Sequence, residues 1–225
     1  MKVELLNPEM CKDFFKRWGE TSCVCYNTLR KYAERVGKSC FLSGHYSGSR
    51  DQFFKFEITC SRACIDQLAR HEVGVVKNVM SGRYVDFSDF EYYTPELVAE
   101  DDDLNCLYRE AMMASKIYYN MIVKNLNDKD IKGEQAFEIA RGIAPMNHNT
   151  KAIISFNLEA LINLSHKRLC SCAQKEIREV VKEMVKLVTK EIPELSTHLV
   201  PICGHLKYCP ENKNRSCGMF KTLDQ

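Results

Sequence analysis

The sequence predicts a fold that combines short β-strands with several helices. The N-terminal MKVELL has the composition of a strand, and in FFKFEIT the apolar Phe54, Phe56 and Ile58 alternate with charged residues, as in a half-buried strand. Amphipathic stretches elsewhere predict helices. The 225 residues are enough to bury a substantial core. We interpret them as one domain over residues 1–225, with a cysteine-containing tail from about residue 199.

Composition excludes several classes of partner. The formal net charge of +2 gives no general basic character, so we expect no nucleic-acid partner. No apolar run approaches membrane-spanning length, and the first ten residues lack the apolar core of a secretory signal. We therefore expect a cytoplasmic protein without a membrane partner. The twelve cysteines are then expected to be reduced thiols that pack as small apolar residues.

Two helices are expected before the FFKFEIT strand. Asn7 followed by Pro8 is typical of a helix start, after which Met10, Phe14 and Trp18 share one face. The stretch TLRKYAERVGK predicts a second helix that ends at its glycine, Gly37.

Residues 61–84 contain the strongest functional signal. If Ser61 caps a helix, Ile65, Leu68 and Ala69 form one apolar stripe. Arginine forks and exposed loop amides suit phosphate, so the polar residues around and beyond that helix indicate an anion site. An ordinary helix followed by a polar loop is the alternative. The polar residues are Gln67, Arg70, His71, Gly74, Asn78, Ser81, Gly82 and Arg83.

Three further helices follow. The acidic run at residues 100–103 is interpreted as a solvated loop that opens a long buried helix, LNCLYREAMMASKIYYNMIVKNL, whose methionines fill a core. GEQAFEIARGIA predicts a helix that stops before Pro145. In the block from Ser155 to Val188, one apolar face is traced by Ala173, Ile177, Val180, Met184 and Leu187.

The tail raises the question of a metal. Cys203, His205, Cys209 and Cys217 could supply the four ligands of a zinc site. Their spacing is irregular, whereas zinc sites usually show closely paired ligands. We therefore expect no metal and interpret these thiols as free or packed.

The region from Arg70 resembles the signature of the flavin-dependent thymidylate synthases. That signature is Arg-His-Arg, seven residues, Ser and then x-Arg-Tyr, and it is matched by Arg70, His71, Ser81, Arg83 and Tyr84. The third basic position is instead Glu72, and eight residues separate it from Ser81.

Other blocks resemble the family in the same order. They are His45 and Ser47 as His-x-Ser, Arg141, Asn157, Asn163, Arg168, and the run from Ala173 to Ile177. The chain departs from the family at Val79, Glu159 and Cys172. The family usually has arginine in place of Glu159, so a carboxylate there is expected to weaken flavin binding by about 1 kcal/mol, unless a neighbour such as Lys77 offsets it.

The resemblance implies an α+β domain in which helices pack on a small antiparallel sheet, and a homotetramer with active sites between subunits. It implies reductive methylation of dUMP to dTMP, with methylenetetrahydrofolate as carbon donor and FAD reduced by NADPH as hydride source. Two alternatives stay open. One is an enzyme of the same fold that transfers a methyl or hydroxymethyl group to another pyrimidine nucleotide. The other is a nucleotide-binding homologue that has lost flavin chemistry.

The resemblance also assigns residues. Arg168 is the catalytic residue, which polarises the pyrimidine ring. Ser81 is assigned to binding, because no base is obvious beside it and a hydroxyl alone is a weak nucleophile. The dUMP-binding residues are Gln67, Arg70, Ser81, Gly82, Arg83, Arg141 and Arg168. The FAD-binding residues are His45, Ser47, Arg70, His71, Glu72, Asn78, Asn157 and Asn163.

Overall fold

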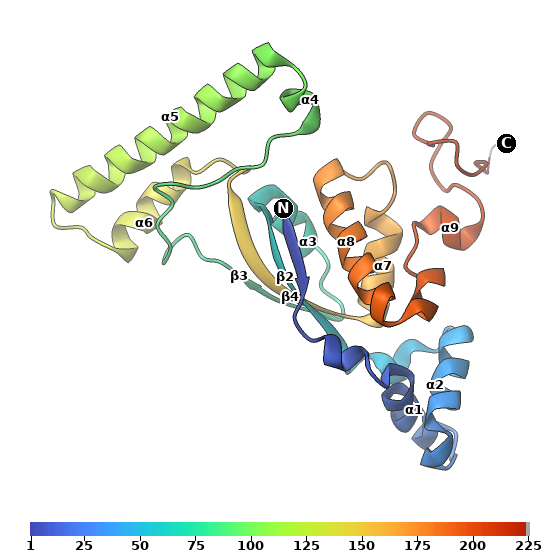
Figure 1. The fold of residues 1–225 in the computed structure, drawn as a ribbon. Helices are drawn as coiled ribbons and strands as arrows, with labels where there is room; N and C mark the ends of the chain where they lie inside the picture. Colours follow the sequence, from blue (N-terminus) through green and yellow to red (C-terminus); the bar gives the residue numbers. More distant parts are fainter. Residues whose placement is uncertain (224–225) are drawn as a thin grey trace. The chain divides into compact units, whose positions relative to one another are not determined.

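The protein has an α+β fold that contains one small antiparallel sheet (Figure 1). The computed structural model describes residues 1–223. Its four strands are ordered β1-β2-β4-β3 in the sheet. They are β1 (Lys2–Leu5), β2 (Phe53–Ser61), β3 (Val75–Val79) and β4 (Asn149–Asn157). The α+β prediction is confirmed.

Helices make up most of the regular structure. The α-helices are α1 (Phe14–Cys25), α2 (Ala33–Leu42), α3 (Arg62–Ala69), α4 (Glu96–Ala99), α5 (Asp102–Asn127), α6 (Glu134–Ala140), α7 (Leu158–Arg168), α8 (Lys175–Glu191) and α9 (Ile202–Leu206). Short 3-10 helices cover Pro8–Cys11, Arg30–Tyr32, Tyr46–Ser49, Arg141–Ile143 and Pro193–Thr197. Within residues 1–223, no helix combines the length and the apolar character needed to cross a bilayer.

The described chain divides into two compact units, each built from segments distant in sequence. Unit 1 contains residue 1, residues 59–67 and residues 78–152, whereas unit 2 contains residues 2–58, 68–77 and 153 onward. The strands β2, β3 and β4 each contribute residues to both units. Our interpretation of residues 1–225 as one domain stays a prediction, and residues 224 and 225 lie outside the described part.

The core of unit 2 includes the alternating strand β2. Phe54, Phe56 and Ile58 are almost fully buried, and the residues between them are more exposed, as predicted. Phe56 packs edge to face on Phe156 of β4, with 6.4 Å between the ring centroids. In α8 the predicted apolar face is confirmed by the buried Ile177, whereas Ala173 precedes the helix. Of the other predicted residues, Val180 and Met184 are buried and Leu187 is only partly buried; Val181 and Val188 are buried as well.

The helix that starts after Asn7 is shorter than predicted. Pro8 opens a 3-10 helix that ends at Cys11, and α1 begins only at Phe14. The Asn7 amide does not cap the helix: its Nδ2 donates to the carbonyl of Phe53 at 2.7 Å, and its Oδ1 accepts from the amide of Lys55 at 2.8 Å. Asn7 therefore ties the start of the chain to β2.

The prediction that Gly37 ends a helix is wrong, because α2 continues through it to Leu42. Gly37 is buried, and a Cβ there would lie 1.9 Å from the carbonyl oxygen of Phe15. On the facing helix, a Cβ at Gly19 would lie 1.6 Å from the carbonyl oxygen of Ala33. The two glycines thus allow the backbones of α1 and α2 to touch (Figure 1).

In unit 1 the long helix α5 begins where the acidic run predicted it. The Asp101 side chain accepts from the amide of Leu104 at 2.9 Å and caps the helix. The core of this unit joins Tyr119 of α5 to Phe87, whose amide donates to the Tyr119 hydroxyl at 3.0 Å.

The prediction that α5 is buried and that its methionines fill a core is only partly right. Met112 is buried with Tyr119, but Met113 is 59% exposed and Met121 is 51% exposed. Further large apolar side chains of α5 are also exposed: Leu104, Leu107, Ile117 and Tyr118. The helix therefore has an apolar face that its own unit does not cover.

The glycine contact between α1 and α2 generates a stability prediction. Gly37→Ala should lower the free energy of unfolding by about 1–3 kcal/mol, because the methyl group overlaps the Phe15 carbonyl and forces the helices apart. A urea titration followed by circular dichroism measures the change. Gly142→Ala is the matched control, since no atom lies within 4 Å of a Cβ at Gly142. Equal unfolding midpoints for the two variants would contradict this packing.

Candidate active site

The signature segment begins with a capped helix, as predicted. The Ser61 hydroxyl accepts from the amide of Cys64 at 3.1 Å, and α3 extends from Arg62 to Ala69. Ile65 and Leu68 are fully buried. The helix ends immediately before Arg70, so the two basic residues of the signature lie at its C-terminal end and not on its face.

A strand follows the signature helix, where the sequence indicated a polar loop. Gly74 adopts φ +73° and the chain enters β3 at Val75. A Cβ on Gly74 would lie 2.5 Å from the side chain of Asn157, whose backbone amide donates to the Gly74 carbonyl at 2.9 Å. Glycine is therefore required here both by the backbone angle and by the close approach.

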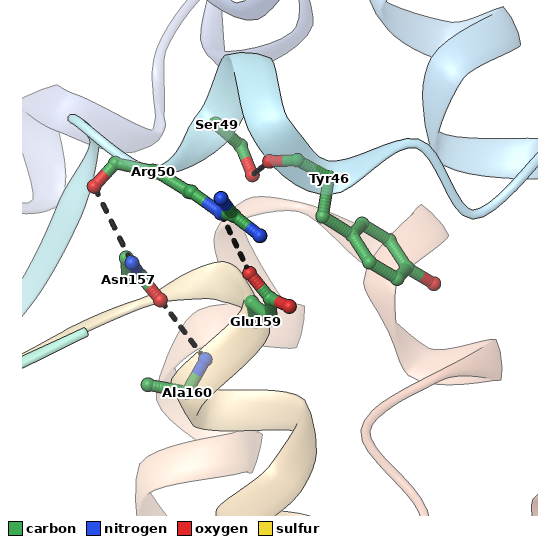
Figure 2. A network of polar contacts seen from close by, with 6 residues as sticks. All are labelled: Tyr46, Ser49, Arg50, Asn157, Glu159 and Ala160. Carbon is green, nitrogen blue, oxygen red and sulfur yellow. Dashed lines mark hydrogen bonds and ion pairs between the residues drawn. The ribbon is translucent and has the colours of Figure 1, made fainter. Parts of the chain in front are cut away.

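Asn157, a predicted flavin contact, caps α7 (Figure 2). Its Oδ1 accepts from the amide of Ala160 at 2.9 Å, and its Nδ2 donates to the carbonyl of Arg50 at 3.3 Å. The capping oxygen satisfies an amide that the first helical turn leaves unpaired. The asparagine thereby joins the loop before β2 to the start of α7.

Glu159 is neutralised by Arg50, not by Lys77 as the sequence analysis suggested. The Arg50 Nε lies 2.9 Å from the Glu159 Oε2 (Figure 2), whereas the Lys77 Nζ donates to the carbonyl of Ala69 at 2.6 Å. Sequence reasoning missed Arg50. The one available signal was an arginine directly after the small-residue loop that contains His45 and Ser47.

A cavity of about 430 Å³ lies beside the first signature residues within unit 2. It is lined by Arg70, His71, Glu72, Val73, Ala160, Asn163 and Lys167. We call it the signature pocket. Two lining side chains are cationic and one is an amide, and Ala160 belongs to the first turn of α7, where the helix dipole is positive. The pocket therefore favours an anionic group.

His71 of the signature pocket contacts Arg168. The Arg168 Nε donates to the His71 Nε2 at 3.4 Å, a bond that requires an unprotonated acceptor nitrogen. Burial, which has the largest effect, and the positive charges of Arg168, Lys167 and Lys77 together lower the pKa of His71 to about 4. His71 is thus a neutral imidazole at physiological pH. It orients Arg168 without adding a charge.

Four of the remaining predicted nucleotide residues lie together in unit 1. The Ser81 hydroxyl accepts from the amide of Arg83 at 3.3 Å, and a Cβ at Gly82 would lie 3.5 Å from the Cβ of Arg141. The Nε of Arg83 is 3.2 Å from the Oε2 of Glu138 in a half-exposed ion pair. Gln67 belongs to the same unit, on α3.

The other predicted flavin residues are placed apart from the signature pocket. The His45 Nδ1 lies 3.1 Å from the hydroxyl of Tyr26, and both side chains line a separate cavity of about 360 Å³. Ser47 is in the following 3-10 helix, and its carbonyl accepts from the amide of Arg50. Asn78 is exposed on β3, whose last two residues belong to unit 1. The flavin roles of these residues stay predictions.

The donor set of the signature pocket fits the phosphate groups of a flavin nucleotide, because Arg70 and Lys167 are cationic and Asn163 is an exposed amide. Glu72 is the exception, since its carboxylate repels an anion. The lining residues that could hold such a cofactor are Arg70, His71, Asn163 and Lys167, and Asn157 positions the first turn of α7 beside them.

Comparisons with known proteins agree with the resemblance. A family model described as "Thymidylate synthase complementing protein" matches residues 11–194. A flavin-dependent thymidylate synthase of Nitratidesulfovibrio vulgaris is 34% identical over 179 residues, which cover 79% of this chain and 73% of that protein. Flavin-dependent thymidylate synthases of Clostridium tetani and Mycolicibacterium gilvum are 33% and 28% identical, each over 50% of this chain and 48% of the relative.

The lowered pKa of His71 generates a pH prediction. The unfolded chain binds a proton near pH 6.5 and the folded chain only near pH 4, so protonation favours unfolding. The stability from neutral His71 is complete above pH 6.5 and is lost as the pH falls toward 4. Urea unfolding of the wild type and His71→Gln at several pH values measures this. The wild type should lose stability relative to the variant across that window, and parallel profiles would contradict the assignment.

Proposed function

Because the chain belongs to the thymidylate synthase complementing protein family, we propose that it is a flavin-dependent thymidylate synthase. The proposed reaction is the reductive methylation of dUMP to dTMP. Methylenetetrahydrofolate donates the carbon, and FAD that NADPH has reduced supplies the hydride when it is bound. The observation that carries the proposal is the signature pocket with its cationic Arg70 and Lys167, whose neutral His71 accepts a hydrogen bond from Arg168.

The chemistry explains why a fixed guanidinium is needed. The ring carbon of dUMP is a poor nucleophile, so an enzyme must either add a thiolate to the ring or stabilise negative charge on it directly. None of the described residues that line the signature pocket is a cysteine. We therefore assign charge stabilisation to Arg168, which stays protonated at any working pH and is oriented by His71.

The nucleotide phosphate suits the arginines of the signature. A guanidinium offers parallel donors to a phosphate, so we assign Arg70, Arg83 and Arg141 to dUMP, with Ser81 and Gly82 as further binding groups. To bind the phosphate, Arg83 must then leave Glu138 or share its guanidinium between the two anions. The free-energy cost is small, because the ion pair with Glu138 is half-exposed. Gln67 completes the proposed nucleotide set.

We assign FAD to the residues of the signature pocket and to those at the start of α7. Arg70, Asn163 and Lys167 would hold its anionic groups, and Asn157 fixes the helix start against which it would lie. His45, Ser47, Glu72 and Asn78 keep the flavin role that the family resemblance implies.

A homotetramer with active sites between subunits is part of the proposal. The exposed apolar side chains of α5, including Leu107, Met113 and Tyr118, support association of subunits, because monomeric proteins rarely leave a large apolar patch in water. Light scattering of the purified chain measures its mass in solution.

The first functional prediction concerns substrate dependence and Arg168. The purified chain with added FAD should oxidise NADPH faster when dUMP is present, and with methylenetetrahydrofolate it should form dTMP. Arg168→Ala should lower dTMP formation by about 100-fold or more, because it removes the charge that stabilises the transition state. Product formation is followed by chromatography.

Arg30→Ala is the matched control, since Arg30 belongs to the 3-10 helix Arg30–Tyr32 and does not line the signature pocket. Two outcomes would overturn the assignment. Stimulation by another pyrimidine nucleotide but not by dUMP indicates a different substrate. Failure to take up FAD under any condition indicates a binding protein without flavin chemistry.

The second functional prediction concerns the ion pair between Arg50 and Glu159. Glu159→Gln should tighten FAD binding by about fivefold, roughly 1 kcal/mol, because it removes a carboxylate near the pocket and frees the Arg50 guanidinium for an anion. Fluorescence titration with FAD at low and moderate salt measures the change. Glu183→Gln, which breaks an exposed pair with Lys186 on α8, should leave the affinity unaltered. Equal affinities for the wild type and Glu159→Gln would place this pair away from the cofactor.

A further inference from the structure

Two cysteines and a glutamate form a tight group within unit 2, outside the signature pocket. Cys170 and Cys172, in the loop after α7, offer two sulfurs, and Glu211 in the tail offers a carboxylate oxygen. These three atoms all lie within 4.8 Å of one another. We call the three residues the Cys-Glu cluster. Cys170 and Glu211 also line a cavity of about 220 Å³, so open volume lies beside the cluster.

A turn holds the two cysteines of the cluster. The amide of Ala173 donates to the carbonyl of Cys170 at 3.0 Å, which closes a four-residue turn with the cysteines at its first and third positions. Arg178 of α8 fastens this turn, since its Nη1 donates to the carbonyl of Ser171 at 2.9 Å. Cysteine pairs that bind zinc usually have at least two residues between them, and here the turn brings together two sulfurs with one residue between.

The third member of the cluster is carried by a second turn, in the tail. The amide of Arg215 donates to the carbonyl of Asn212 at 3.0 Å and to its side-chain Oδ1 at 3.1 Å. The thiol of Cys172 donates to the carbonyl of Arg215 at 3.2 Å. The Nε of Arg215 is 3.5 Å from the Oε2 of Glu211. The loop after α7 and the tail therefore meet at the cluster.

The separation of the three atoms suits a single small ion. Around a tetrahedral zinc ion, sulfur and oxygen ligands lie about 3.6–3.8 Å from one another. Ligand atoms within 4.8 Å need to approach by no more than about 1 Å to reach that separation. Cys172 is exposed and can rotate toward the others, and water can reach the fourth position of the ion.

The surroundings supply a compensating charge. Two thiolates, a carboxylate and a divalent ion carry a net charge of about −1, which the guanidinium of Arg215 offsets. A carboxylate has two oxygens, so Glu211 can keep its ion pair while one oxygen binds the ion. Arg215 would then act as an outer partner that orients a ligand.

We propose that the Cys-Glu cluster binds one zinc ion through the Sγ atoms of Cys170 and Cys172 and one carboxylate oxygen of Glu211, with water as the fourth ligand. Zinc is the ion of choice because it accepts both thiolate and carboxylate ligands. Each thiol loses its proton as a sulfur–zinc bond forms, so binding releases protons and changes no oxidation state. The ion fastens the tail to the loop between α7 and α8.

The neighbouring thiols provide matched controls. Cys203, Cys209 and Cys217 line the same cavity, but within residues 1–223 none of them joins a group of three ligand atoms this close together. Our expectation of no metal at these three cysteines and His205 stays a prediction. A serine substitution at Cys217, which is exposed, therefore removes a nearby thiol without touching the cluster.

The experiment measures zinc in the full-length chain, purified with a reductant, without chelator and from zinc-supplemented cells. Mass spectrometry of the metals should find about one zinc per chain. Cys172→Ser should retain less than about a tenth of that amount. Glu211→Gln should weaken zinc binding by about tenfold or more, measured by competition with a coloured chelator. Cys217→Ser, and Glu183→Gln on α8, should match the wild type.

A cobalt spectrum tests the ligands of the wild type directly, whether or not the variants fold. Saturating Co²⁺ should give sulfur-to-metal charge-transfer bands, with about half the intensity in Cys172→Ser because one of two thiolates is gone. Reduced wild-type protein that holds no zinc, or a cobalt spectrum without these bands, would overturn the proposal. Full zinc content in Cys172→Ser, or its loss in Cys217→Ser, would overturn the ligand set.

Discussion

The junction of β4 with α7 depends on one close contact, in which the side chain of Asn157 occupies the space that a side chain at position 74 would need. The contact fixes the turn after the signature helix, since the Gly74 carbonyl accepts from the amide of Asn157. The same asparagine caps α7 and holds the Arg50 carbonyl. The side chain of Asn157 thereby positions both walls of the signature pocket. These walls are residues 70–73 and the start of α7.

The protonation state of His71 in unit 2 is set by its burial and by the cations around its imidazole. Arg168, Lys167 and Lys77 each disfavour a proton on His71, and burial disfavours it more. A neutral histidine can accept a hydrogen bond from a guanidinium, whereas an imidazolium would repel it. The pocket can therefore keep several positive groups for an anion without losing their arrangement.

Sequence reasoning succeeded where structure is decided locally. The cap at Ser61, the helix start at the acidic run and the alternation in β2 each depend on residues a few positions apart, and all three are confirmed. The family resemblance predicts site roles for Arg70, His71 and Arg168, and the structure brings the last two into contact.

The misses concern contacts between distant residues. Arg50 and Glu159 are 109 positions apart, so no pattern in either segment announces their ion pair. Similarly, Cys170 lines the same cavity as Cys203, Cys209 and Cys217, from which the helix α8 separates it in the sequence. Apolar periodicity in α5 identified a helix but could not tell which of its side chains the chain itself would cover.

The glycine pair between α1 and α2 restricts how this part of the protein can evolve. The backbones already touch at Gly19 and Gly37, so any larger residue at either position clashes with the facing helix. No single substitution there is neutral. A lineage that replaces one glycine must also shift a whole helix, which alters the neighbouring aromatic layer of Phe15, Trp18 and Phe41. These two helices are thus expected to diverge together, as one inherited block, while the surface around them varies freely.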